Sequence, residues 1–360
     1  MLPRWLSLKP VVPGDWEDVD ARWMTRAIRH RHSDAVVGKV HLVTRADGTN
    51  RRARFRLEYA QGTGPEFVFC KAHRAGHRWI HWKNGNLFIE ARLYASGAEL
   101  PLETPVVYEA VPDYPRLDFL LVMEDLEQRD AFMRNTTAPL SVDEVASGLR
   151  GLASLHSHYW GITASSHPHL RWVKQWEVSE GWTGGLNRRM PLGLSRTEGC
   201  VSDSIQALPG PEIVDLWARF VASLATGPQT LLHGDAHIGN VYTLPDGTCG
   251  FLDWQVTRRG NWSQDMGYFL VGTLSPEDRR AHEDELLAIY RDALTVPDKP
   301  AMEELRLRYR AGHIYGLAIW LSTLGTDGWQ PHDFSRSLVE RYGAAFAEQD
   351  TVGALDELGS

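Results

Sequence analysis

The order of the expected secondary structure limits most strongly what this chain can fold into. Before residue 125, short strand-forming segments alternate with turn signals such as Asp47-Gly48. After residue 126, apolar residues recur at helical spacing instead. The expected strands are 36–44, 53–59, 67–71, 104–110 and 119–123, with one helix among them at 86–98. Because strands come first and helices follow, the sequence predicts an α+β chain of two lobes, with domains 1–125 and 126–360.

Local signals place the starts of several helices. Asp15 is expected to cap a helix that continues to Ala27, and Ser141 with Glu144 forms a capping box that opens another. The stretch 167–210 is rich in Gly, Ser, Pro and Trp, so we expect irregular structure or a broken helix there. Further helices are expected at 212–224, 275–294, 301–324 and 333–349.

Composition and charge narrow the class of protein. The 360 residues are 43% hydrophobic and 23% charged, as in a globular chain long enough for two lobes. A formal net charge of −8 and a pI of about 6.0 argue against a nucleic-acid partner bound through a basic face. No run approaches the ~20 apolar residues that span a bilayer. Pro3, Pro10 and Pro13 interrupt any signal peptide, and three widely spaced cysteines indicate neither disulfides nor a zinc site. We expect a cytoplasmic protein without membrane or nucleic-acid partners, of undetermined oligomeric state.

Residues 231–254 carry the strongest chemical signal. The sequence Leu-Leu-His-Gly-Asp-Ala-His-Ile-Gly-Asn fills 231–240 and Gly-Phe-Leu-Asp-Trp fills 250–254, so Asp235 is followed by Asn240 and then by Asp253. Phosphoryl transfer from ATP needs one carboxylate to orient the attacking hydroxyl, and an amide and a second carboxylate to hold Mg²⁺ on the phosphates. We interpret Asp235 as the catalytic base, and Asn240 and Asp253 as metal ligands.

Each of these residues has a simpler interpretation when it is taken alone. Asp235 and Asn240 could be turn residues, and Asp253 could cap the next segment; only their joint spacing favours catalysis. His233 and His237 flank Asp235, but no other His or Cys cluster lies near, so a zinc-dependent hydrolase is a minor alternative. His233 is expected to pack under the loop and to bond its backbone.

Nucleotide-binding residues are expected in the N-terminal lobe. Lys71 ends an apolar strand and Glu90 lies on the following helix, so they form a candidate ion pair that aims the ammonium at the α- and β-phosphates. Gly48 and Thr49 are the best candidates for a turn that covers the phosphates, and no Gly-x-x-x-x-Gly-Lys motif is present. Asp265 opens an apolar helical stretch and is expected to anchor the catalytic loop, with His233 as a second support.

With these motifs, the chain resembles the aminoglycoside phosphotransferase and choline kinase group, and most closely its ecdysteroid kinase-like branch. The resemblance covers residues 35–275 and is strongest at 231–270. It implies the protein-kinase-like fold, in which a small β-sheet lobe carries one key helix and the larger lobe is mainly helical. It also implies ATP or GTP with Mg²⁺. Met123 and Glu124 match the hinge that carries the adenine in this family, and Lys71, Glu90 and Asp265 match its lysine, its helix glutamate and the aspartate that supports its catalytic loop.

Aromatic residues indicate the class of acceptor. The stretch 165–200 has a net positive charge, which does not suit a polycationic aminoglycoside. Indole surfaces suit a sugar face, a nucleoside or a flat apolar body, although any single Trp is more often part of a core. The acceptor-binding candidates are Trp172, Trp176, Trp182, Trp320 and Trp329.

The sequence therefore predicts a kinase that transfers the γ-phosphate of ATP to a hydroxyl of a small molecule, such as an antibiotic, nucleoside, sugar or other natural product. The alternative is a kinase-shaped binding or regulatory protein without turnover. The intact set of Lys71, Asp235, Asn240 and Asp253 weighs against that alternative.

Overall fold

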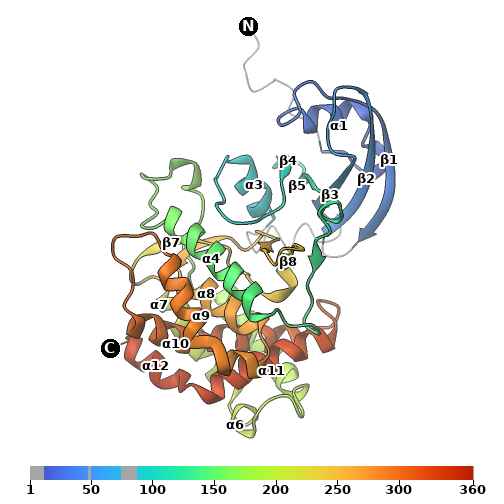
Figure 1. Ribbon diagram of the computed structural model, residues 1–360. Coiled ribbons are helices and arrows are strands. Elements are labelled where there is room, and N and C mark those ends of the chain that lie inside the picture. The colour runs from blue at the N-terminus through green and yellow to red at the C-terminus, as the bar shows by residue number, and fades with distance from the viewer. Residues whose placement is uncertain (1–11, 48–49, 74–86, 360) are drawn as a thin grey trace. The chain divides into compact units, whose positions relative to one another are not determined.

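The computed structural model describes residues 12–47, 50–73 and 87–359, and these form two compact units (Figure 1). The first unit comprises Met1–Glu99, Thr104–Ala131 and Asp253–Val256. The second comprises Leu100–Glu103, Phe132–Leu252 and Thr257–Ser360. A short segment that begins at Asp253 thus belongs to the first unit, although most of its neighbours in the sequence belong to the second. The functional division at residue 125 stays a prediction.

The first unit is built on a five-stranded antiparallel sheet in the order β1-β2-β3-β5-β4 (Figure 1). Alternate residues Ala53, Phe55 and Leu57 of β2 are buried, as the period of two along a strand requires. Its elements are η2 (Trp16–Asp18), α1 (Ala21–Ile28), β1 (Val36–Asp47), β2 (Asn50–Gln61), β3 (Phe67–His73), α3 (Ile89–Ala95), β4 (Val107–Asp113), β5 (Asp118–Glu124) and η4 (Leu126–Arg129). All five predicted strands and the intervening helix are present, with shifted ends.

The prediction of one continuous helix from Asp15 to Ala27 is wrong. Asp15 caps only a short 3-10 turn, and the α-helix α1 begins anew after Asp20, whose carboxylate accepts a hydrogen bond from the Trp23 N–H at 2.6 Å. Val19 between them has an extended backbone. Two capping aspartates five residues apart therefore divide a stretch whose apolar spacing fits one helix. Trp16 and Trp23 both still reach the core of this unit.

The second unit is mainly helical, with one two-stranded sheet (β10-β7) and one three-stranded sheet (β6-β8-β9). Its strands and 3-10 turns are β6 (Phe132–Met133), η5 (Pro168–Leu170), β7 (Gln229–Leu232), η6 (Ile238–Asn240), β8 (Val241–Thr243), β9 (Cys249–Phe251) and β10 (Arg258–Asn261). Its α-helices are α4 (Val142–His158), α5 (Glu180–Ser195), α6 (Asp203–Gln206), α7 (Gly210–Ser223), α8 (Ser263–Thr273), α9 (Pro276–Ala293), α10 (Met302–Leu324), α11 (His332–Glu348) and α12 (Thr351–Gly359).

The stretch 167–210 holds η5, α5 and α6 with non-helical segments between them, which agrees with the expectation of irregular structure or a broken helix. The length of α5 was not predicted. Ser179 caps it by accepting from the Trp182 N–H, and the helix continues through Pro191 to Ser195. Its glycines allow close packing on α10: a Cβ at Gly193 would lie 2.0 Å from the Leu321 carbonyl oxygen. Packing against α10 thus outweighs the low helix propensity of Gly and Pro, which is all that the sequence reveals locally. Helix α12 was also not predicted.

Helix α10 is the centre of the second unit and contacts α5, α7, α8, α11 and α12 (Figure 1). Buried residues occur all round it rather than along one stripe, as in a helix that other elements surround. None of the helices in the described residues is both long enough and apolar enough to cross a membrane.

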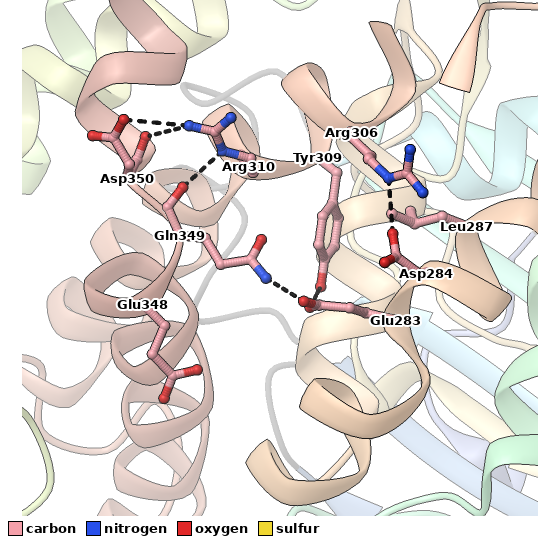
Figure 2. Close-up of a pocket in the computed structure, with 9 residues that line it drawn as sticks. All are labelled: Glu283, Asp284, Leu287, Arg306, Tyr309, Arg310, Glu348, Gln349 and Asp350. Carbon is pink, nitrogen blue, oxygen red and sulfur yellow. Dashed lines mark hydrogen bonds and ion pairs between the residues drawn. The ribbon is translucent and has the colours of Figure 1, made fainter. Parts of the chain in front are cut away.

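A polar pocket of about 420 Å³ lies among α9, α10 and the C-terminal end of α11 (Figure 2). Interactions within the protein hold its charged groups: Arg306 pairs with Asp284, and Glu283 accepts from the Tyr309 hydroxyl at 3.0 Å. The Gln349 amide also donates to Glu283. None of the residues predicted for the catalytic or nucleotide site lines this pocket. We interpret its network of ion pairs and hydrogen bonds as one that holds these helices together.

One residue beside this network makes stability depend on pH. His313 of α10 is buried, and burial together with the positive charge of Arg279 lowers its pKa to about 3. Arg310 acts in the same direction, while Gln349 opposes it. In the unfolded chain the imidazole takes up a proton below about pH 6.5, whereas in the folded chain it stays neutral until about pH 3. The unfolded state therefore binds more protons between these values, and stability falls as the pH falls through this window.

We expect the wild-type protein to lose about 2 kcal/mol of unfolding free energy from this residue alone between pH 7 and pH 5. His313→Gln should show a smaller loss over the same range, because glutamine does not titrate. Denaturant unfolding at both pH values measures the difference. His169→Gln, at an exposed histidine of the same unit, is the matched control and should behave as wild type. An equal pH dependence in His313→Gln and wild type would contradict this account.

Candidate active site

The loop that carries Asp235 follows β7, whose Leu231 and Leu232 are fully buried and pair with β10. Gly234 has a φ of +84°, a backbone conformation that side chains with a Cβ rarely adopt. This residue turns the chain out of the strand, so Asp235 lies at the end of a packed element with its side chain 26% exposed. The expectation that Asp235 sits near the surface of a packed element is therefore met.

Asp265 anchors this loop from the first turn of α8. Its fully buried carboxylate accepts from the backbone N–H of His233 at 2.6 Å and from that of Gly234 at 2.8 Å. His156 Nε2 lies 3.3 Å away, and the hydroxyl of Tyr290 in turn contacts His156 Nδ1 at 2.8 Å. Because several donors compensate the buried charge, the carboxylate can hold the loop at a fixed position. The anchoring contact predicted for Asp265 is present.

The histidine before Gly234 supports the loop through its ring. His233 Nδ1 accepts from the Asp235 N–H at 3.2 Å, so in the neutral ring the proton resides on Nε2, which lies 2.8 Å from the Leu252 carbonyl oxygen. His233 is buried, and its role as a ring that packs under the loop and bonds its backbone agrees with the sequence interpretation. The ring thereby connects the loop to the residue that precedes Asp253 in the chain.

Asn240 holds the carboxylate of Asp235 from the other end of the loop. Its Nδ2 donates to Asp235 Oδ2 at 3.1 Å and to the Asp235 carbonyl oxygen at 2.9 Å. Because the amide nitrogen faces Asp235, the amide oxygen of Asn240 points elsewhere and is the atom that a cation can use. His237 Nε2 lies 3.7 Å from Asp235 Oδ2, and His237 Nδ1 accepts from the Gly239 N–H at 3.0 Å.

In the first unit, Lys71 of β3 lies between two carboxylates. Its Nζ is 2.7 Å from Glu90 Oε2 and 3.0 Å from Asp253 Oδ1. The predicted ion pair of Lys71 with Glu90 therefore forms, and Asp253 joins it. Burial acts to lower the pKa of Lys71, but the charges of Asp253 and Glu90 outweigh it and raise the pKa, so the ammonium stays charged. Burial raises the pKa of Glu90, which the charge of Lys71 opposes, so Asp253 is the carboxylate of this group that a hard cation can use.

Asp253 has a left-handed backbone, with a φ of +63°. Aspartate is one of the few residues with a Cβ that adopts this conformation without a large penalty. The following N–H, that of Trp254, points at Glu90 Oε1 at 3.4 Å. The left-handed backbone of Asp253 is a property of the folded chain that the sequence pattern does not reveal.

Of the other residues predicted to contact nucleotide, two are described by the structure and two are not. Met123 ends the buried core of β5, and Glu124 Oε2 accepts from the Val106 N–H at 2.9 Å, so this side chain has a structural use. Their role as an adenine hinge stays a prediction. Gly48 and Thr49, predicted to cover the phosphates, lie outside the residues that the structure describes.

The five tryptophans predicted to bind the acceptor fall into two groups. Trp176 and Trp320 are almost fully buried, at 2% and 3% exposure, so their rings pack within the protein. Trp172 and Trp182 are half-buried, and Trp329 is 55% exposed. Two of the five are therefore unsuited to direct stacking with a ligand, and they occupy the core positions that are more common for a single tryptophan.

The sequence interpretation missed Tyr268 of α8. Its hydroxyl lies 3.4 Å from Asp235 Oδ1 and accepts a hydrogen bond from the indole N–H of Trp320 at 2.9 Å. The signal that could have found it is helical spacing, because Tyr268 follows the anchor Asp265 by three residues and therefore lies on the same face of α8.

The oxygen atoms of Asn240 and Asp253 are hard ligands of the kind that Mg²⁺ prefers, and Mg²⁺ usually takes only one or two protein ligands beside phosphate and water. These residues therefore fit the implied metal. Within the described ranges, no three or more His, Cys, Asp or Glu side chains gather in a way that could hold a metal ion.

Comparison with protein families decides the class of the chain. Residues 41–306 match the phosphotransferase enzyme family. The chain belongs to the phosphotransferase enzyme family. The resemblance to aminoglycoside phosphotransferases and choline kinases is thereby confirmed, and the predicted enzyme class, a phosphotransferase with an alcohol group as acceptor, agrees with this membership. Its placement in the ecdysteroid kinase-like branch stays a prediction.

One of the similar solved structures supports the fold. A spectinomycin phosphotransferase, solved with ADP and spectinomycin, matches with a TM-score of 0.50 at 13% identity, over 91% of this chain and 98% of that chain. A choline kinase from Streptococcus pneumoniae matches with a TM-score of 0.45 at 14% identity, over 91% and 98%. A macrolide 2′-phosphotransferase from Brachybacterium faecium matches with a TM-score of 0.45 at 12% identity, over 91% and 98%. No curated protein gave a significant match. The predicted two-lobed, protein-kinase-like α+β fold is confirmed.

Proposed function

We propose that this phosphotransferase moves the γ-phosphate of ATP to a hydroxyl group of a small molecule, with Mg²⁺ as cofactor. The proposal rests on two groups of side chains, one in each unit. One is an aspartate, Asp235, at the end of a buried strand and held by Asn240 and an anchored loop. The other is a buried lysine, Lys71, held by Glu90 and Asp253. Membership of the phosphotransferase family supports this assignment of both.

The reaction assigns one role to each group. The acceptor oxygen attacks the γ-phosphorus, the bond from that phosphorus to the β–γ bridging oxygen breaks, and ADP leaves. Asp235 orients the acceptor hydroxyl and receives its proton. Lys71, kept charged and in place by Glu90, contacts the α- and β-phosphates. Asn240 and Asp253 would hold Mg²⁺, which, when bound, neutralises charge on the phosphate oxygens.

For the acceptor, we propose a neutral or weakly charged molecule with a ring system. Trp329 offers the exposed ring, and the guanidinium of Arg189 lies 4.7 Å from its centroid. Arg189 Nε donates to Ser322 Oγ, and none of the ion pairs among the described residues involves Arg189. Burial and the neighbouring Arg188 lower its pKa, as expected for an uncompensated positive charge. A positive charge beside the ring disfavours a polycation, and the exposed indole suits a neutral ring.

Trp329→Ala is expected to raise the KM for the acceptor several-fold and to leave kcat nearly unchanged. Stacking contributes only about 0.5–1.5 kcal/mol beyond burial, and it is made equally in the ground state and the transition state. Steady-state kinetics with the acceptor as varied substrate measures both constants. Phe132→Ala is the matched control, because Phe132 is also an exposed ring of the same unit with an arginine, Arg134, over its face. An unchanged KM in Trp329→Ala, or an equal rise in KM in the control, would contradict the proposal that Trp329 binds the acceptor.

A screen of nucleotide turnover tests the proposed function as a whole. ATP or GTP is supplied with Mg²⁺ and a panel of hydroxylated antibiotics, nucleosides, sterols and amino alcohols, and ADP or GDP formation is followed. We expect acceptor-dependent turnover with at least one ring-bearing neutral compound. Turnover of kanamycin-like polyamines alone would contradict the acceptor class, while nucleotide binding without turnover of any compound would favour a silent binding protein.

A further inference from the structure

Tyr268 contacts the proposed catalytic carboxylate from outside the catalytic loop. Its hydroxyl lies 3.4 Å from Asp235 Oδ1, while the Asn240 amide occupies Oδ2. Asn240 belongs to the same loop as Asp235, but Tyr268 is on α8, the helix that also carries the anchor Asp265. Helix α8 thus makes two contacts with the loop. Asp265 accepts from the loop backbone, and Tyr268 contacts the side chain of Asp235.

The direction of the hydrogen bonds is determined by Trp320. An indole N–H can only donate, so the 2.9 Å contact from Trp320 Nε1 makes the Tyr268 oxygen an acceptor. The hydroxyl proton of Tyr268 is then directed elsewhere, and Asp235 Oδ1 is a strong acceptor within reach. A directed chain results, in which Trp320 donates to Tyr268 and Tyr268 donates to Asp235. Burial, with the charge of Asp235, raises the pKa of Tyr268 well above its usual value, so this donor keeps its proton.

Packing restricts the ring of Tyr268 to one orientation. The ring of Tyr342 stacks on it at 5.3 Å with an interplanar angle of 17°, and the Tyr342 hydroxyl donates to the Tyr268 carbonyl oxygen at 2.6 Å. Tyr315 meets it edge-on at 5.2 Å. Trp320 is fixed in turn between Phe334, at 5.7 Å, and His237, at 5.0 Å. A hydroxyl held this firmly selects one orientation of the carboxylate that it contacts.

We propose that Tyr268 is a positioning residue for phosphoryl transfer, and that Trp320 acts through it rather than by binding the acceptor. Tyr268 holds the Asp235 carboxylate in the orientation that accepts the substrate hydroxyl. This inference rests on the proposed function, since it assigns a use to Tyr268 only where Asp235 takes part in the reaction. The proposal also assigns a role to Trp320, which is 3% exposed and therefore unsuited to stacking with a ligand.

Tyr268→Phe removes the hydroxyl and keeps the ring. We expect kcat to fall about tenfold, as for the loss of one hydrogen bond to a charged group, with the KM values for ATP and acceptor changed less than about twofold. The readouts are ATP turnover with the best acceptor of the panel and ATP hydrolysis with water as acceptor. Tyr309→Phe is the matched control. Tyr309 is also a buried tyrosine of this unit that donates to a carboxylate, Glu283, but it lies in the helix network of Figure 2.

Tyr309→Phe should lose a similar amount of thermal stability and keep wild-type kcat. Trp320→Phe should lower kcat by a smaller factor and have no further effect in the Tyr268→Phe background, because both changes interrupt one chain. In the Asp235→Asn background, Tyr268→Phe should likewise have no further effect. If Asp235→Asn abolishes turnover while Tyr268→Phe matches Tyr309→Phe in kcat, this inference fails and the proposed function stands. If Asp235→Asn retains full turnover, the catalytic role proposed for Asp235 fails, and with it this inference; if the wild-type protein turns over no acceptor, the proposed function itself fails.

Discussion

Asp235→Asn is expected to lower kcat by about a hundredfold or more, within the range that a general base contributes. The amide has nearly the same shape, but it has one oxygen, so it can accept from Asn240 or from Tyr268 and not from both, and it cannot receive the proton of the acceptor hydroxyl. ATP binding should change little, because the residues proposed to contact the nucleotide belong to the other unit of the chain. Single-turnover transfer from ATP measures the first quantity, and calorimetric titration with a non-hydrolysable ATP analogue measures the second.

Asp246→Asn is the matched control for this prediction. Asp246 is an exposed turn aspartate between β8 and β9, in the same segment of the second unit, and its carboxylate accepts from the Thr248 N–H. It should retain wild-type kcat. Near-full activity in Asp235→Asn would show that Asp235, too, is only a turn residue.

Asp253→Asn is expected to weaken binding of ATP in the presence of Mg²⁺ by at least about tenfold and to leave binding without Mg²⁺ almost unchanged. Asparagine is the informative substitution because it tolerates the left-handed backbone at this position, so the change removes charge without adding backbone strain. Calorimetry with and without Mg²⁺ measures the metal-dependent gain in affinity directly. This readout does not depend on the identity of the acceptor.

The control is Asp130→Asn, an exposed aspartate of the same unit with a φ of +51°. It should keep the full metal-dependent gain. The metal assignment of Asp253 is contradicted when Asp253→Asn and Asp130→Asn respond to Mg²⁺ alike. Because Lys71 contacts Asp253 at 3.0 Å, a loss of affinity that is the same with and without Mg²⁺ would indicate instead that the substitution acts through the lysine.

The catalytic loop could be predicted from the sequence because its chemistry is encoded locally. Asp235 and Asn240 lie within one loop, Asp253 follows after one short hairpin, and each side chain acts close to its own backbone. Lys71 and Glu90 lie on different elements, a strand and the next helix. Their pairing could be predicted only by adding the order of these elements along the chain. The five strands of the first unit could be predicted for the same reason, because strand-forming segments and the turn signals between them are also local.

Contacts that depend on the packing of distant segments could not be predicted. The sequence around Trp320 shows only a tryptophan on a helix, and nothing local reveals that its indole donates to Tyr268, 52 positions away. The length of helix α5 could not be predicted, because Gly193 and Pro191 have low helix propensity, whereas close packing on α10 decides the outcome. The left-handed backbone of Asp253 is likewise a property of the folded chain.

The measurement that tests the central claim most directly is identification of the products after incubation of the protein with ATP, Mg²⁺ and each compound of the acceptor panel. Phosphorus NMR and mass spectrometry of the acceptor distinguish a phosphate ester on a hydroxyl from inorganic phosphate. We predict one new phosphate ester formed in equal amount to ADP by the wild-type protein, and none by Asp235→Asn. ATP that is bound but never consumed with any compound, or a phosphate ester formed equally well by Asp235→Asn, would contradict the account.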